Sequence, residues 1–195
     1  MLTEIFRKGG SFFPAACSPG YRIYQASFKD AALIRAIMET VTDTLEDKSL
    51  FIPDGQDFVE RVLTSDGFGL LAADHKNTAA AYLLVLFPGL EADNLGLELD
   101  FDASRLKQVA HMDSLAVLPA HRGQHLQQSL ILCAEKILDY DDRPYRMATV
   151  SPSNLPSLKN FLACGYEIRA TREKYGGYIR HILLKYKVKA TDSGL

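Results

Sequence analysis

Apolar and polar positions alternate along this chain with two periods, and the change between them predicts a succession of strands and helices. The stretch from Tyr21 to Ala26 has the period of a strand, whereas the apolar positions between Leu33 and Leu45 fall on one face of a helix. The expected strands are 21–26, 67–73, 78–87, 109–118, 146–150, 167–173 and 178–188. The expected helices are 27–45, 53–63, 123–138 and 154–165, with one helical turn at 103–108.

This mixture of strands and helices predicts a single domain of the α/β or α+β class. With 195 residues the chain is long enough for one well-buried core and short for two. We expect the domain to span 1–188 and the polar tail 189–195 to be flexible.

The composition narrows the class of protein further. Hydrophobic residues make up 47% of the chain and charged residues 24%, as in an ordinary globular domain. The formal net charge of −2 argues against nucleic-acid binding, and no apolar run approaches the roughly 20 residues of a membrane span. Three cysteines without a CxxC pair argue against a disulfide framework and a zinc site. We therefore expect a cytoplasmic protein without a metal ion.

The stretch LAVLPAHRGQHLQ, from Leu115 to Gln127, is the most informative part of the chain. An apolar strand ends at Pro119, and Arg122 and Gly123 lead directly into an amphipathic helix. A strand, a tight turn and a helix in that order bring free backbone N–H groups and the positive end of a helix to one point. The stretch therefore predicts a site for phosphate groups.

Two motifs resemble those of one known family. In the first, Val117-Leu118-Pro119 precedes the segment 122–127, which follows the pattern Q/R-x-x-G-x-G/A with Arg122 at its first position. The second, in the segment 151–168, follows the pattern N-x-x-A/S-x-x-x-F/Y-x-x-x-G-F/Y. Its positions are filled by Asn154, Ser157, Phe161, Gly165 and Tyr166. Together, in this order and at this separation, the motifs resemble those of the GCN5-related N-acetyltransferases (GNAT family).

The resemblance implies a fold, a cofactor and a reaction. The fold is a central, mostly antiparallel twisted sheet of six to seven strands flanked by about four helices. The cofactor is acetyl-CoA, whose acetyl group would pass directly to a primary amine of a small molecule or peptide. The backbone N–H of Val117 would stabilise the oxyanion, and Asn154 would bind the pantetheine arm, cap its own helix, or do both. The residues implied in cofactor binding are Leu115, Ala116, Val117, Arg122, Gly123, Gln124, His125, Leu126, Gln127, Asn154, Ser157 and Phe161.

Three positions depart from the family pattern. His125 and Gln127 stand where the phosphate motif has small residues, so their side chains would shift the cofactor or point away from it. Phe161 replaces the tyrosine that serves many members as general acid. Tyr166 is a neighbouring candidate for that catalytic role, although its position normally packs. A thiol pKa of roughly 8.5 would also let the thiolate leave without a proton.

His111 and Asp113 are the candidate general bases. With a period of two, His111, Asp113 and Leu115 point to the same side of their strand unless a bulge intervenes. A histidine beside a carboxylate titrates in the right pH range to deprotonate an amine. The same two residues also fit a polar pair at the solvated end of a strand, so both interpretations stay open.

A non-catalytic acyl-CoA-binding module is the alternative to an enzyme, and Phe161, His125 and Gln127 favour it. The identity of the amine acceptor stays open because loops decide it, and so does an acyl group other than acetyl. The acidic run 91–102 would attract a cationic amine or is simply a solvated loop. Tyr175 on the last hairpin is expected near the acceptor, although a sheet residue needs no functional role. The exposed edge of a carboxy-terminal strand would allow a homodimer.

Overall fold

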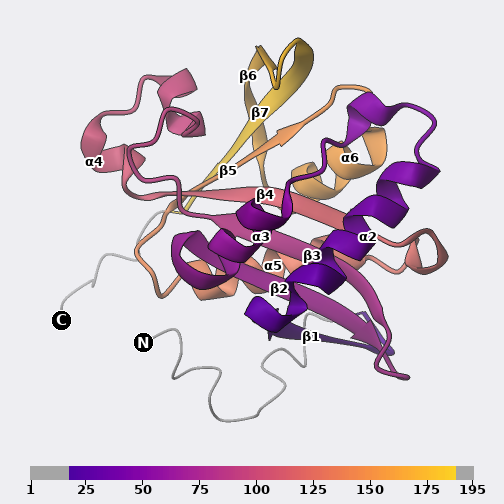
Figure 1. Cartoon of the computed structure of the whole chain (residues 1–195). Helices are drawn as coiled ribbons and strands as arrows, with labels where there is room; N and C mark the ends of the chain where they lie inside the picture. Colours follow the sequence, from indigo (N-terminus) through magenta and orange to yellow (C-terminus); the bar gives the residue numbers. More distant parts are fainter. Residues whose placement is uncertain (1–17, 188–195) are drawn as a thin grey trace.

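The protein is described here by a computed structural model, which covers residues 18–187. Its centre is a seven-stranded sheet in the order β1-β2-β3-β4-β5-β7-β6, in which β4 and β5 are parallel and the other neighbours antiparallel (Figure 1). The strands are β1 (Tyr21–Ala26), β2 (Gly67–Asp74), β3 (Ala79–Leu86), β4 (Val109–Val117), β5 (Tyr145–Val150), β6 (Glu167–Lys174) and β7 (Tyr178–Tyr186). The α-helices are α2 (Ala31–Thr44), α3 (Gln56–Arg61), α4 (Ala103–Leu106), α5 (Leu126–Leu138) and α6 (Leu155–Ala163). Shorter helical turns are η1 (Phe28–Asp30), η2 (Lys48–Leu50), η3 (Val62–Asp66), η4 (Leu95–Leu99) and η5 (Pro119–His121).

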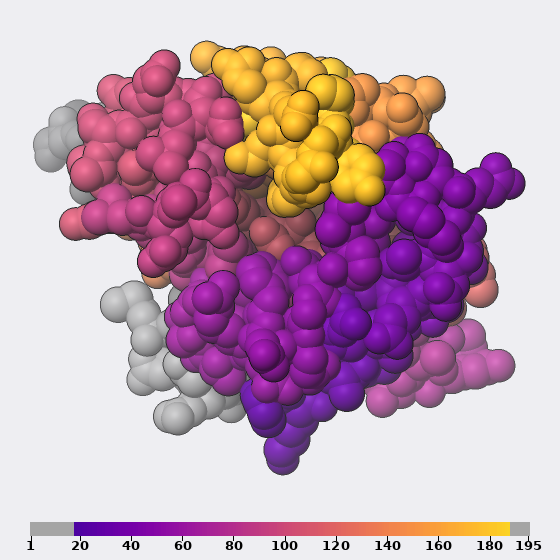
Figure 2. Space-filling model, turned by 45° about the horizontal axis from the view of Figure 1, so that its top comes forward, coloured from indigo at the N-terminus to yellow at the C-terminus, as the bar shows by residue number. Residues whose placement is uncertain are grey.

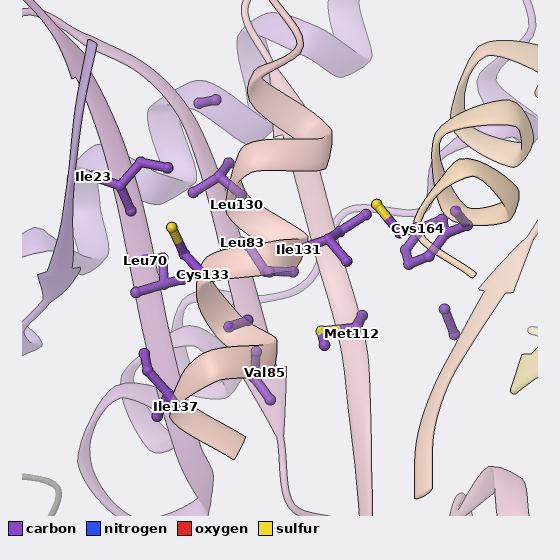
Figure 3. Packing of buried hydrophobic residues seen from close by; sticks show 14 of the residues in the cluster. Ile23, Leu70, Leu83, Val85, Met112, Leu130, Ile131, Cys133, Ile137 and Cys164 are labelled. Atoms are coloured by element: carbon purple, nitrogen blue, oxygen red, sulfur yellow. The ribbon is translucent and has the colours of Figure 1, made fainter. Parts of the chain in front are cut away.

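Helices cover both faces of the sheet. On one face, Leu130 of α5 packs in a buried cluster with Leu83 of β3 and Met112 of β4 (Figure 3), and α6 joins the same cluster. On the other face, Ile34 of α2 packs in a cluster with Tyr82 of β3. A fully buried aliphatic side chain contributes about 1.5–3 kcal/mol, so these two layers hold the central strands in fixed positions.

β4 contains a β-bulge at Asp113. Ser114 pairs with Leu84 of β3, whereas Met112 pairs with the very next β3 residue, Val85. Asp113 is therefore an extra residue between two consecutive β3 positions, and the alternation of side chains restarts after it.

The bulge places Leu115 and His111 on opposite faces of the sheet. Leu115 lies opposite Leu83, in the cluster beneath α5, and His111 lies opposite Leu86, in the cluster beneath α2. The exception named for a bulge therefore applies: Leu115 does not share the side of His111, because the inserted residue changes the phase of the strand.

β4 and β5 separate after three residue pairs. Parallel pairing joins residues 109–111 to 145–147, while β4 stays paired with β3 up to Val117 and β5 with β7 up to Val150. The carboxyl halves of the two parallel strands therefore diverge, and the chain enters α5 and α6 shortly beyond them. The carboxyl ends of parallel strands are where α/β sheets bind their ligands.

The expected strands and helices are present, and the predicted fold class is confirmed. The helix expected from Gly123 begins only at Leu126, because Gly123 and His125 have φ angles of +76° and +54°, which no α-helix contains. No helix among residues 18–187 is long and apolar enough to cross a membrane. Two of the three cysteines, Cys133 and Cys164, lie buried in the core, and Cys17 and the tail 189–195 lie outside the described residues.

Candidate functional site

A groove of about 440 Å³ lies at the opening between β4 and β5. Residues 115–117 of β4 and the turn before α5 form one side, the first turns of α6 form the other, and Val41 and Phe51 close it from the α2 side. The predicted cofactor residues that border it are Leu115, Ala116, Val117, Arg122, Gly123, His125, Leu126, Gln127, Asn154 and Ser157. Of the remaining two, Gln124 lies within the turn and Phe161 borders a neighbouring cavity.

The turn before α5 is tied to the start of the sheet. The hydroxyl of Ser18 donates a hydrogen bond to the carbonyl of Gln124, and the hydroxyl of Tyr21 lies 2.9 Å from Nδ1 of His121. At Gly123, with its φ of +76°, a Cβ atom would meet no other atom within 4 Å. Glycine therefore serves the backbone conformation at this position, and the space beside it is open.

His125 is the residue from which α5 starts. It adopts the left-handed conformation, with φ +54° and ψ +20°, where the family motif has glycine. A side chain in this conformation costs about 1–2 kcal/mol. The helix start has no side-chain cap, so its first N–H groups keep their capacity to bind an anion in the groove. The turn fits the phosphate site that the sequence predicted.

Asn154 stands where the groove meets the smaller cavity. Its Oδ1 accepts a hydrogen bond from the N–H of Ser157 at 3.2 Å, so it caps α6 as one of the two sequence interpretations expected. Asn154, Ser157 and Leu115 border both spaces. The two spaces therefore adjoin each other at the amino end of α6.

Gln127 does not point away from the groove. Its Nε2 donates to Oγ of Ser157, and its Oε1 accepts from Nδ2 of Asn160, both at 2.9 Å. Gln128 extends the same network by donating to Oδ1 of Asn160 at 2.9 Å. The side chain thus joins α5 to α6 at the edge of the groove.

The smaller cavity, of about 140 Å³, lies under the hairpin of β6 and β7. Figure 2 shows a hollow beneath this yellow hairpin, with the purple segment around residue 50 on its other side. Its polar lining includes Asp54, Asp113, Thr149, Tyr175 and Arg180, and its apolar lining includes Phe51 and Phe161. The smaller cavity thus brings two carboxyl groups, those of Asp54 and Asp113, next to the end of the groove.

Asp113, the extra residue of the bulge, borders this cavity. Burial raises the pKa of its carboxyl to about 8, and the negative charges of Asp54 and Asp93 add to the effect. Burial also raises the pKa of Asp54, against the lowering effects of the Ser114 hydroxyl and of Arg35. A carboxyl group with a pKa near neutrality can both accept and hold a proton.

His111 has a different environment from Asp113. Its Nε2 accepts a hydrogen bond from the backbone N–H of Leu95 at 3.0 Å, which fastens η4 to the sheet. Burial, with a smaller contribution from Lys174, lowers the pKa of His111 to about 3. Among residues 18–187, those that border the two cavities include Asp113 but not His111.

Tyr166 lies in the core under α5. Its ring packs edge-on against Phe161, with 5.1 Å between the ring centroids. Burial and the charge of Glu135 raise its pKa well above the usual range. It does not border either of the two cavities formed by the described residues, so Asp113 is the one predicted catalytic residue that does.

The tip of the β6–β7 hairpin covers the smaller cavity. Tyr175, at a φ of +54°, places its hydroxyl 2.9 Å from Oγ1 of Thr149 on β5. Lys174 forms an ion pair with Glu98 of the acidic segment at 2.8 Å. The predicted position of Tyr175 near the acceptor is consistent with this geometry. The tip of the hairpin is held by Thr149 on β5 and by Glu98 of the acidic segment.

Arg180 closes the other side of the same cavity. Its guanidinium donates to the carbonyl of Ser49 at 2.6 Å and lies 5.7 Å from the ring centroid of Tyr175. The sequence pattern does not single out Asp54, Thr149 or Arg180. Their positions along the chain follow no common period, and Asp54 stands in a Pro-Asp-Gly sequence that predicts only a turn.

The fold was compared with known proteins. No family model matches the chain, and no curated protein matches it in sequence. A GNAT-family acetyltransferase from Streptococcus pneumoniae matches in structure with a TM-score of 0.63 and 16% identity, covering 85% of this chain and 98% of that chain. The ribosomal-protein-S18-alanine N-acetyltransferase from Escherichia coli matches with a TM-score of 0.66 and 13% identity, over 90% and 99% of the two chains.

A third similar structure was solved with a bound cofactor. It is an aminoglycoside acetyltransferase in complex with coenzyme A and kanamycin, with a TM-score of 0.62 and 14% identity over 86% of this chain and 95% of that chain. All three likenesses extend over nearly the whole of the matched chains. The prediction made from the two sequence motifs is confirmed for the architecture: this chain has the fold of the GNAT-family acetyltransferases.

Proposed function

We propose that this chain is an acetyl-CoA-dependent N-acetyltransferase that passes the acetyl group directly to a primary amine of a small molecule or peptide. One observation carries the proposal: the groove with the phosphate turn and the cavity with Asp113 meet at Leu115, Asn154 and Ser157. A thioester whose phosphates lie at the turn would present its acetyl group at this junction, next to the carboxyl group.

The groove would hold the cofactor mainly through backbone groups. The uncapped start of α5 would bind the pyrophosphate, and residues 115–117 would run beside the pantetheine arm. The N–H of Val117 would donate to the oxyanion, and the fixed position of the thioester would lower the entropic part of the barrier. These roles require no particular side chain at His125 or Gln127.

Asp113 would act as the general base. The amine would enter as an ammonium ion, lose a proton to the Asp113 carboxylate, and attack the thioester carbonyl. The new C–N bond would form as the C–S bond breaks, and the CoA sulfur would leave as a thiolate. The second proton of the attacking nitrogen would pass to this thiolate or to water, which leaves the neutral amide. Phe161 has no proton to give, and a thiol pKa of roughly 8.5 makes an unassisted thiolate an adequate leaving group.

The shape and charge of the smaller cavity support a cationic acceptor with a narrow reactive end. Two carboxylates line a space of about 140 Å³ that the hairpin covers. An ammonium group on a slender arm would be attracted by Asp54 and Asp113 and would fit beneath Tyr175.

The test is the release of free CoA from acetyl-CoA across a panel of primary amines. We expect turnover with at least one cationic amine and a new amide detected by mass spectrometry. Phe161 favours the second candidate function, a non-catalytic acyl-CoA-binding module. Saturable CoA binding without turnover on any amine would support that module and contradict the enzyme.

A further inference from the structure

Two arginines are buried among residues 18–187, and their partners differ. Arg146, which is 2% exposed, forms an ion pair with the carboxylate of Asp139. Arg180 is 4% exposed, and its hydrogen bonds go to the backbone carbonyls of Ser49 and Ile179. Within the described part of the chain, no carboxylate oxygen lies within 4.0 Å of its guanidinium. Arg180 is therefore a buried cation whose direct partners are neutral.

The guanidinium of Arg180 keeps capacity for a further partner. The rings of Tyr175 and Tyr178 have their centroids 5.7 and 5.4 Å from its central carbon. Burial lowers the pKa of Arg180, against the raising effects of these two tyrosines and of Asp47. A guanidinium has more N–H donors than the two hydrogen bonds to backbone carbonyls use. An anion that enters the cavity would supply the counter-ion that the buried charge lacks.

The same cavity contains two carboxyl groups that Arg180 does not neutralise. Asp54 and Asp113 border the cavity together with Arg180, and no ion pair within 4.0 Å joins either of them to it in the described residues. Burial raises the pKa of Tyr175, and the charges of Asp113 and Asp54 raise it further. The charge of Arg180 lowers the same pKa. The three charged groups therefore lie around one space near Tyr175 without pairing with one another.

The volume of this space limits the size of what it can enclose. It measures about 140 Å³, close to the ~150 Å³ of a cavity that holds one benzene molecule, with about six non-hydrogen atoms. A small free amino acid has about this number of atoms and carries an ammonium group and a carboxylate together. A polyamine or an amino sugar is larger and offers no anionic group to the guanidinium.

We infer that Arg180 is a specificity-determining residue that binds the carboxylate of the acceptor, so that the substrates are small free amino acids whose ammonium group faces Asp113. The inference rests on the proposed acetyl transfer and names its substrate class. The planar donors of a guanidinium match the two oxygens of a carboxylate. An amine without a carboxylate would leave Arg180 buried without a counter-ion, and the site would therefore discriminate against it.

The experiment compares amino acids with their carboxamides, which keep the amine and lose the negative charge. The pairs are glycine, β-alanine and γ-aminobutyrate, each with its amide, and the readout is kcat/KM from the release of free CoA. We expect the wild type to prefer at least one amino acid over its amide by about 10–100-fold, mainly through KM. Equal or better turnover of all three amides would overturn the inference.

Arg180→Gln removes the charge and keeps a donor for the carbonyl of Ser49. We expect it to lose the preference for the amino acid while the amide is turned over within about threefold of the wild-type value, and an unchanged preference would overturn the role of Arg180. If Arg180→Gln turns over no amine, Arg180→Lys decides. A preference that is present but smaller than in the wild type supports the inference, and an unchanged one overturns it.

Arg172→Gln is the matched control. Arg172 pairs with Arg180 across β6 and β7, its side chain is 53% exposed, and within residues 18–187 it borders neither cavity. We expect the control to keep the wild-type preference, and an equal loss in both variants would overturn the inference. Turnover of amides without any preference for amino acids would leave the proposed function intact. Absence of turnover with every amine tested would overturn both.

Discussion

The two halves of the site are built in different ways. The cofactor groove is formed by consecutive residues of one strand–turn–helix unit and by the start of the next helix. The cavity proposed for the acceptor is formed by segments that lie far apart in the sequence, and its polar side chains include Asp54, Asp113, Thr149 and Arg180. The groove depends on backbone conformation and the cavity on the burial of charge. Substitutions in the two halves should therefore change different quantities.

The largest expected effect comes from the buried carboxyl group of Asp113 in the smaller cavity. The pKa of Asp113 is about 8 in the folded protein and about 3.8 as a free group, so the folded state holds a proton that the unfolded state has lost between these pH values. The protonated form stabilises the protein fully below pH ~4, and this stability is lost as the pH rises to about 8. Asp113→Asn removes the effect.

As the pH rises from ~4 to ~8, the free energy of unfolding of the wild type should therefore fall relative to that of Asp113→Asn, by up to about 1.4 kcal/mol per pH unit. His111, whose pKa is lowered to about 3 in the folded state, gives a slope of the opposite sign. It is present in both proteins and cancels in the difference. Urea titrations at several pH values measure the effect, and parallel stability curves would contradict the burial of Asp113.

The next largest effect, on the affinity for CoA, is expected from a substitution in the turn before α5. Gly123→Val places a branched residue at a φ of +76°, where the space for a side chain is open but the conformation is not favoured. We expect CoA to bind about tenfold more weakly, on the basis of a strain of about 1–2 kcal/mol. Gly123→Asn is the control, because asparagine tolerates this conformation better. If calorimetry finds equal affinities for the two variants, the turn does not act through its backbone.

A smaller effect should follow from the coupling of the two carboxylates. The negative charge of Asp54 helps to raise the pKa of Asp113, so Asp54→Asn should lower it. The acidic limb of the kcat profile should move to lower pH, which raises the rate on that limb roughly threefold. An unmoved limb at saturating amine would show that Asp54 does not act on the base.

The sequence predicted the groove because its signals are local. Alternating apolar residues mark β4, and Pro119, Arg122 and Gly123 mark the turn, since each type has a conformational preference of its own. The periodicity predicts the start of α5 three residues too early, because it does not reveal that His125 takes a left-handed conformation. The local pattern therefore predicts the order of strand, turn and helix, but not the left-handed conformation of His125.

The acceptor cavity could not be predicted to the same extent because it depends on tertiary placement. The apolar pattern of β4 does not reveal the bulge, and the bulge places Leu115 and His111 on opposite faces of the sheet. In the sequence His111 and Asp113 are equally good candidates for the base. In the structure the imidazole of His111 accepts a hydrogen bond from Leu95 of η4, whereas Asp113 borders the cavity. Asp54 and Arg180 reach the site only through the folding of distant segments.

In the proposed function the groove would bind the cofactor and Asp113 would accept the proton of the amine. The test measures kcat/KM for the amine and Kd for CoA in Asp113→Asn. The matched control is Asp43→Asn, which replaces an exposed carboxylate on α2. We expect Asp113→Asn to lose about 10²–10⁴ in kcat/KM while its Kd for CoA stays within about twofold of the wild type, and we expect no change in the control. Wild-type turnover by Asp113→Asn would show that Asp113 is not the general base.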